Sequence, residues 1–386
     1  MLFTADRIHD GKGWLPENTI IETDDNGTIL SVYQSENREG VTVLEGLLAP
    51  GFVNVHCHLE LSHMKGVVPK HTGLIGFLKQ IPALRNSFSD EQKRTARKAA
   101  YEELYVNGTV AVGDIANTSD ALDVRALGKM HIHTFTEALG FNPAPERMYG
   151  YAQQAFEAYN GQEGNGKMLR QSMVPHAPYS VSQPFFSLID QHQPESIISI
   201  HNQECCAENE FYISKDGMVR DLLSGMGIDD SFFVPSGKTS LQTYLEWISP
   251  THPVIFIHNT FTTKEDIDTA RRLMPQTFWC LCPNANLYIE NTLPDVPLFI
   301  KEGLNICVGT DSLASNHQLS ILSELTTLKK NFSELDWEIL LTWATLNGAR
   351  ALQMQHVIGS IEVGKQPGLV QIRGLGSDVP TIKRII

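Results

Sequence analysis

Residues 51–58 read GFVNVHCH, a short apolar run that ends on two histidines. Runs of this length, rich in β-branched and aromatic residues, are typical of buried strands. Residues two positions apart on a strand point to the same side, so His56 and His58 are predicted to face one region of space. Several later runs end in the same way, and together they predict the architecture.

Seven further strand candidates follow, and stretches with helical periodicity lie between several of them. Strands that alternate with helices predict a parallel sheet with crossover helices, and eight such strands predict a closed (β/α)8 TIM barrel of the α/β class. The eight candidates end at His58, Ile115, Leu139, His176, His201, His258, Cys282 and Asp311. Two intervening helices open with capping-box spacing, Ser89 with Gln92 and Thr262 with Glu265.

The two ends of the chain carry a different pattern. Short β-type runs broken by Asn-Gly and Gly occupy the N-terminal segment, and two more lie at residues 360–364 and 368–374. We expect residues 1–50 and 355–386 to pair as a small β-sandwich-like module. Residues 51–354 are then expected to form the barrel.

Charge and hydropathy limit the classes of partner. The chain has 30 Lys and Arg against 44 Asp and Glu, a net charge of -14, without a dense basic run, which argues against nucleic acid. It shows neither a signal-peptide pattern nor about 18 consecutive apolar residues, which argues against export and against a membrane partner. We therefore expect a cytoplasmic protein with reduced cysteines and a small-molecule substrate. The oligomeric state stays open, with a homodimer as the commonest assembly.

Four of the expected strand ends supply the histidines and the aspartate of a candidate metal site: His56 with His58, His201, His258 and Asp311. Active sites of TIM barrels lie at the C-terminal ends of the strands, so side chains far apart in sequence can converge there. Three imidazoles, from His56, His58 and His201, and the Asp311 carboxylate make a ligand set for one divalent metal. Zinc is the first choice and iron the alternative, with a coordination position left for water.

Two other features are weighed from position alone. His131 and His133 repeat the H-x-H spacing, but they open their strand, which places them at the opposite face as structural residues. Glu204 follows His201 by three residues, where a carboxylate could reach both a bound water and a substrate nitrogen. Its spacing alone leaves a solvated loop glutamate equally open.

Longer motifs carry a family resemblance. They are PGFVNVHCHLELSHMKG (50–66), HAPYSVS (176–182), HNQE (201–204), IFIHNT (255–260), CPNAN (282–286) and GTDSLASN (309–316). Their order and spacing resemble the amidohydrolase superfamily, within it the branch of nucleobase, nucleoside and triazine deaminases and chlorohydrolases. The resemblance spans about Ala49 to Gly368. One departure is Ala285 in CPNAN, where serine is usual.

The resemblance implies a role for each residue. The metal ligands would be His56, His58, His201 and Asp311. Glu204 would be the proton-shuttling acid and base, and His258 with Asp311 would hold and polarise the water. His176 would contact the substrate near the scissile group. Binuclear relatives carry a lysine at the position of His176, so one metal is expected.

The predicted reaction is hydrolytic deamination of a C–N bond in a cyclic amidine, such as a nucleobase or a purine-nucleoside-like compound, with release of ammonia. Two alternatives stay open: an amidase-type or chlorohydrolase reaction at the same site, and a catalytically silent metal-binding paralogue. The substrate pocket is expected to include Glu60, Asn117 and Glu137. The segments 59–90, 140–170 and, above all for its length, 211–252 are expected to shape it.

Overall fold

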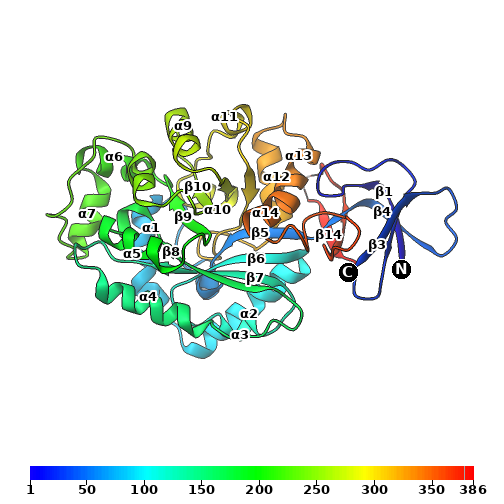
Figure 1. Ribbon diagram of the computed structural model, residues 1–386, viewed down its shortest axis with the longest axis horizontal. Helices are drawn as coiled ribbons and strands as arrows, with labels where there is room; N and C mark the ends of the chain where they lie inside the picture. The colour runs from blue at the N-terminus through cyan, green and yellow to red at the C-terminus, as the bar shows by residue number, and fades with distance from the viewer. Residues whose placement is uncertain (378) are drawn as a thin grey trace.

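The computed structural model describes residues 1–377 and 379–386, and it shows a barrel beside a smaller β module that carries both termini (Figure 1). The barrel strands are β5 (Phe52–Cys57), β6 (Thr109–Ala116), β7 (His131–Ala138), β8 (Leu169–Pro175), β9 (Ile198–Asn202), β10 (Val254–His258), β11 (Thr277–Leu281) and β12 (Ile306–Val308). They form two parallel ladders, β5-β6-β7-β8 and β9-β10-β11-β12. All eight strands expected from the sequence are therefore present.

Two seams join these ladders into a ring. At the first, the backbone N–H of His201 donates to the carbonyl of His176 at 3.0 Å and links β9 to the end of β8. At the second, the N–H groups of Thr310 and Asp311 both donate to the carbonyl of His56 at 3.0 Å, which links the end of β12 to β5. Both seams lie at the C-terminal ends of the strands, among the candidate metal ligands.

Helices surround the barrel and cover its C-terminal end. They are α1 (Gly73–Arg85), α2 (Asp90–Val106), α3 (Leu122–Arg125), α4 (Glu146–Ala158), α5 (Gln183–His192), α6 (Cys206–Ser214), α7 (Met218–Gly225), α8 (Ser240–Tyr244), α9 (Lys264–Leu273), α10 (Pro283–Ile289), α11 (Val296–Lys301), α12 (Ile321–Asn331), α13 (Trp337–Thr342) and α14 (Gly348–Ala351). Among the described residues, no helix combines the length and the apolar character that crossing a bilayer requires.

The N-termini of two helices test the capping boxes that the sequence predicted. Ser89 and Gln92 form the predicted capping box at the start of α2. The prediction for α9 was wrong by one residue, because the box is formed by Thr263 and Asp266. Thr262 is buried instead, and its hydroxyl donates to Gln203 Oε1 at 2.7 Å.

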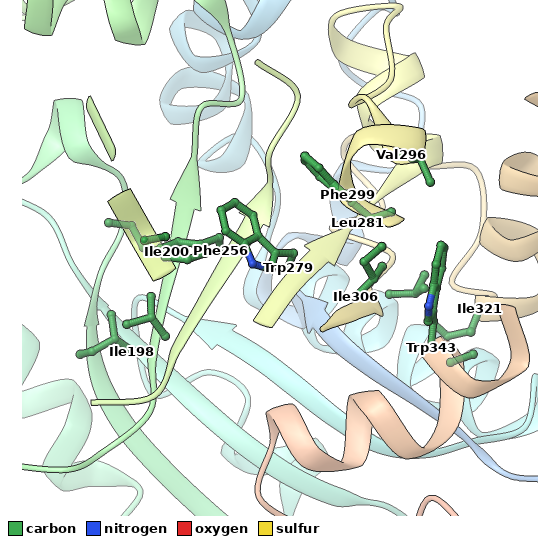
Figure 2. Close-up of a cluster of buried hydrophobic side chains, with 14 of the residues drawn as sticks. Ile198, Ile200, Phe256, Trp279, Leu281, Val296, Phe299, Ile306, Ile321 and Trp343 are labelled. Atoms are coloured by element: carbon green, nitrogen blue, oxygen red, sulfur yellow. The ribbon is translucent and has the colours of Figure 1, made fainter. Parts of the chain in front are cut away.

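Alternation along β9 to β12 sorts side chains between the inside and the outside of the barrel. The buried layer between these strands and the helices around them includes Ile198, Ile200, Phe256, Trp279, Leu281, Val296, Phe299, Ile306, Ile321 and Trp343 (Figure 2). Complete burial of such a side chain contributes about 1.5–3 kcal/mol. Because Ile198 and Ile200 face the helices, the pleat turns His201 to the inside.

The β module is one six-stranded sheet in the order β14-β13-β4-β1-β2-β3. Its strands are β1 (Leu2–Ile8), β2 (Thr19–Thr23), β3 (Ile29–Gln34), β4 (Val41–Pro50), β13 (Leu369–Arg373) and β14 (Thr381–Arg384). The chain ends pair as expected, because β13 runs antiparallel to β4. The expected strand at 360–364 is absent, and this run turns so that the Ile361 N–H bonds to the Asp10 carbonyl.

We predict that Gly309→Ala weakens the seam between β12 and β5. A Cβ at residue 309 would lie 2.8 Å from the Cβ of His56 and 2.9 Å from its carbonyl oxygen, which is closer than packed atoms allow. Overpacking of this kind lowers the free energy of unfolding by about 1–3 kcal/mol. Urea unfolding measures this loss, and elemental analysis should show less bound metal, because His56 would be displaced.

Gly150→Ala is the matched control for this substitution. Gly150 lies inside α4 and nothing approaches its added Cβ within 4 Å, so alanine should leave stability equal or slightly higher. A Gly309→Ala protein as stable as wild type would contradict the close packing at the seam.

Candidate metal centre and active site

Five side chains from the strand ends meet in one buried cluster. Nε2 of His56 and Nε2 of His58 are 3.1 Å apart, and Asp311 Oδ1 lies 3.2 Å from the second and 3.6 Å from the first. The ring centres of His201 and His258 lie 4.8 Å and 5.8 Å from that of His56. The fold thus brings together the four predicted ligands and the predicted water-holding histidine.

The chemistry of this donor set fits a divalent metal. Burial lowers the pKa of His56 to about 3 and that of His201 well below its ordinary value, so both imidazoles are neutral and offer lone pairs. Burial alone would raise the pKa of Asp311, but hydrogen bonds from His56 and His58 outweigh it and hold the pKa well below its usual range. His56, His201 and Asp311 are thus in the states that zinc or iron requires. Burial lowers the pKa of His58, but the hydrogen bond and the charge of Asp311 outweigh it and raise this pKa, so a metal ion would replace a proton there.

Local backbone geometry aims the first two histidines. The ladder between β5 and β6 shifts register between Asn54 and Cys57, so β5 carries one extra residue there. Cys57 packs outward in the cluster that contains Tyr101 and Leu104 of α2. Its neighbours His56 and His58 therefore point the other way, toward Asp311, as the H-x-H spacing predicted.

His258 reaches the cluster by a different route. Regular alternation along β10 would direct it outward, because Phe256 packs outward. The backbone at His258 has a φ of 70°, in the left-handed region, and this breaks the alternation. Asp311 has a φ of 56° at the end of its own strand. The strained backbone at these positions is typical of functional sites.

Hydrogen bonds hold the rings and the carboxylate in place. Nδ1 of His201 donates to the His176 carbonyl at 2.8 Å, and Nδ1 of His258 donates to Asn286 Oδ1 at 3.1 Å. Each of these bonds leaves Nε2 as the free acceptor, the state in which imidazole binds a metal or a proton. The Ser315 hydroxyl donates to Asp311 Oδ2 at 2.5 Å.

Glu204 lies at the edge of the cluster. Its Oε1 is 3.6 Å from Nε2 of His258, and the residue is only 6% exposed, which excludes a solvated loop glutamate. Burial, followed by the charges of Asp311 and Glu290, raises the pKa of Glu204 well above its ordinary value. The site therefore favours the protonated acid, which can give up a proton during a reaction.

A cavity of about 700 Å³ opens onto the cluster and is lined by the four residues predicted to contact substrate, Glu60, Asn117, Glu137 and His176. The polar atoms of the first three are largely engaged within the protein. Glu60 accepts from the N–H groups of Asn117 and Thr118 at 3.1 Å and 3.0 Å. Glu137 Oε2 accepts from Asn117 Nδ2 at 3.0 Å, and its Oε1 lies 3.3 Å from His201 Nδ1. Their contact with a substrate stays a prediction.

The expected segments 59–90 and 140–170 do line the cavity, but sequence reasoning did not identify most of the individual side chains of its wall. Four apolar residues of α1 line it at the helical spacing i, i+3, i+4, i+7: Leu74, Phe77, Leu78 and Ile81. This spacing was the available signal, although it is also the pattern of an ordinary core helix. The segment 211–252 lines the cavity as expected, through residues 222–228. The basic residues His63, Arg85 and Lys93 were also missed, and no spacing signal marks them.

The second H-x-H pair is bonded as a structural pair. Nδ1 of His131 accepts from the Met168 N–H at 2.9 Å, and Nε2 of His133 lies 2.8 Å from Ser172 Oγ. Burial lowers the pKa of His133 to about 3. Within the described part of the chain, neither residue belongs to a group of three potential metal ligands.

Comparison with known proteins places this geometry in a family. The profile of the amidohydrolase family matches residues 47–383. A protein of Helicobacter pylori named adenosine deaminase is 26% identical over 328 residues, which cover 84% of this chain and 78% of that protein. The aminofutalosine deaminase of the same species, crystallised with methylthio-coformycin, superposes with a TM-score of 0.81 at 21% identity, over 96% of this chain and 91% of the other.

A third similar protein is a mutant atrazine chlorohydrolase from Arthrobacter aurescens, crystallised with zinc and atraton. Its TM-score is 0.75 at 16% identity, over 97% of this chain and 88% of that one. At such identities these two structures support the barrel fold alone. Because the family profile covers most of the sequence, from β4 through the barrel into β14, this protein belongs to the amidohydrolase family.

Proposed function

We propose that this protein is a metal-dependent hydrolytic deaminase that removes the exocyclic amino group of a purine-nucleoside-like compound and releases ammonia. The enzyme acts on carbon–nitrogen bonds, other than peptide bonds, in cyclic amidines. The observation that carries the proposal is Glu204, a buried and proton-holding carboxyl group beside the metal cluster, 3.6 Å from His258 Nε2 and open to the cavity. The adenosine deaminase activity named for the Helicobacter relative supports an adenine ring as the reacting group.

The donor set supports one divalent ion, zinc first and iron as the alternative. Its ligands would be His56, His58, His201 and Asp311. One chlorohydrolase relative contains zinc. A bound divalent ion lowers the pKa of water from about 15.7 toward 7 and so supplies hydroxide at neutral pH. A single ion is proposed because His176 stands where binuclear relatives carry a lysine.

The protein groups divide the proton transfers between them. Asp311 and His258 orient the attacking water, and the free Nε2 of His258 accepts its proton, since Nδ1 is held by Asn286. Glu204 protonates the ring nitrogen beside the amino-bearing carbon while the hydroxyl adds to that carbon. The proton taken from water then reaches the amine through Glu204. The C–N bond breaks and ammonia leaves, while the added hydroxyl group gives up its proton, which returns to Glu204, so that a ring carbonyl remains.

Substrate turnover separates this proposal from its alternatives. We expect ammonia from adenosine and 5′-methylthioadenosine, detected with a coupled assay and by the ultraviolet shift from adenine to hypoxanthine. Guanine, cytosine and a chlorotriazine complete the panel. Chloride from the triazine with no ammonia from any adenine compound would favour the chlorohydrolase reaction, and a ring-opened acid would favour the amidase reaction. The cytoplasmic location, the homodimer and the domain boundaries stay predictions.

We predict that Glu204→Gln keeps the bound metal and loses about 10²–10⁴-fold in kcat, the usual contribution of a positioned acid and base. The amide preserves the shape of the side chain but cannot pass a proton. Ammonia release and elemental analysis on the same samples separate the two effects. Glu210→Gln, at an exposed position of α6, is the control and should turn over normally. Near-normal kcat in Glu204→Gln would remove Glu204 from the mechanism.

The two H-x-H pairs provide a matched test of the metal site. His58→Ala should lower bound metal and activity together, because it removes one ligand. His133→Ala removes a buried histidine of the same spacing and should lower stability while leaving about one ion per chain. Elemental analysis and thermal unfolding measure these effects. Two ions per wild-type chain, or full occupancy in His58→Ala, would contradict the proposed ligand set.

A further inference from the structure

The cavity extends beyond the reacting groups along an apolar wall. Its members from α1 and α7 include Leu74, Phe77, Leu78, Ile81, Leu222 and Leu223. The volume of about 700 Å³ lies in the upper part of the range of about 300–1,000 Å³ for small-molecule sites. An apolar part of a ligand that packs against this wall leaves water, and its transfer lowers the free energy of binding. This part of the cavity therefore suits an apolar extension of the substrate.

A second wall carries basic side chains that come from the segment after β5 and from α2. Within the described residues, no carboxylate oxygen lies within 4.0 Å of the Lys93 amine, although this side chain lines the cavity. His63 is 8% exposed and also lines the cavity, and neither of its ring nitrogens has a hydrogen-bond partner in that part of the chain. Among the described residues, no ion pair of Lys93 and no well-formed hydrogen bond of the His63 ring would compete with a ligand.

The neighbouring carboxylates do not pair with Lys93 or His63 because they have other partners. Glu60 accepts from the Thr118 hydroxyl at 2.7 Å and from Arg85 Nη2 at 3.1 Å, besides the two backbone N–H groups described above. Asp120 lies 3.7 Å from Arg97 Nη1. Although the chain has a net charge of -14, no carboxylate of residues 1–377 and 379–386 pairs with Lys93 beside the apolar wall.

The protonation state of His63 matches a role as a neutral donor. Burial lowers the pKa of His63 below its ordinary value; the backbone carbonyl of Arg85 opposes this shift, and the charges of Lys93 and Arg85 add to it. The neutral imidazole carries one N–H donor next to the Lys93 ammonium group. An oxyanion can accept hydrogen bonds from both, and a charged partner makes such bonds stronger than those of a neutral group.

We propose that Lys93 and His63 are specificity residues that bind an anionic group, a carboxylate in the simplest case, at the end of an apolar arm of the substrate. This inference rests on the proposed function. The amino-bearing ring lies at the metal end of the cavity, by Glu204 and His176, and the arm follows the apolar wall. A plain nucleoside has no group that pairs with Lys93. Arg85 acts as a positioning residue, because it holds Glu60.

A matched pair of probes tests this inference. Both are adenosine derivatives with a short alkyl chain at the 5′ position, which ends in a carboxylate in one and in a carboxamide in the other. Wild-type enzyme should deaminate the carboxylate with a kcat/KM about tenfold higher or more, mostly through KM, as expected for a charge-assisted hydrogen bond. In Lys93→Met this preference should fall toward unity, and His63→Leu should move it in the same direction.

Lys98→Met is the control, because Lys98 is exposed on the same helix and does not line the cavity. It should keep both the preference and the turnover of adenosine. Equal kcat/KM for the two probes in an enzyme that deaminates adenosine would overturn the anion subsite and leave the proposed function intact.

Calorimetry measures the affinity of wild type and of Lys93→Met for the two probes. It tests whether the anion subsite exists independently of turnover. Tighter binding of the carboxylate that is lost in Lys93→Met supports the subsite even if no ammonia is released, in which case only the proposed reaction fails. Equal affinity of wild type for both probes overturns the subsite. Thermal unfolding of each variant shows that a lost preference does not come from a lost fold.

Discussion

Closure of the barrel and assembly of the metal cluster depend on one set of hydrogen bonds. The carbonyl of His56 accepts the N–H groups of Thr310 and Asp311, and the His176 carbonyl accepts both the backbone N–H and the Nδ1–H of His201. Each seam between the two ladders thus involves residues whose side chains belong to the site, His56 and Asp311 at one and His176 and His201 at the other. A displacement of one strand against its neighbour would separate the ligands as well as open the ring. Gly309 keeps this distance short, because any larger residue would meet His56.

The second constraint is backbone strain at the ends of two strands. Hydrogen bonds with neighbouring residues stabilise the strained conformations. His258 and Asp311 adopt left-handed backbone conformations, which cost of order 1–3 kcal/mol each for residues other than glycine. Asn286 bonds the ring of one and Ser315 the carboxylate of the other. These backbone conformations bring the His258 ring, a proton acceptor, and the Asp311 carboxylate together in the buried cluster beside Glu204. Asn286, the second asparagine of the CPNAN motif, therefore acts by orienting His258.

Different parts of the cavity serve the reaction and the recognition of the substrate. Groups at the strand ends perform proton transfer, and the loops and helices above them form the walls that meet the rest of a substrate. The helix α1 has an apolar stripe that packs in part against the protein and in part lines open space. Lys93 and His63 line the same cavity, where Lys93 has no ion-pair partner among the described residues, while Glu60 is held by four hydrogen bonds. A family of shared chemistry can vary its substrates through such walls while the metal cluster stays the same.

The sequence by itself determined the eight barrel strands, the capping box of α2 and the set of residues that converge, because periodic burial and the metal affinity of His and Asp at strand ends are local properties. It did not determine the turn at 360–364, the strand β14, the cap of α9 or the inward turn of His258. Tertiary contacts decided each of these. Thr262, for example, lost its capping role to a buried bond with Gln203. The unpaired state of Lys93 likewise depends on which distant residues engage the nearby acids, and no pattern along the chain records that.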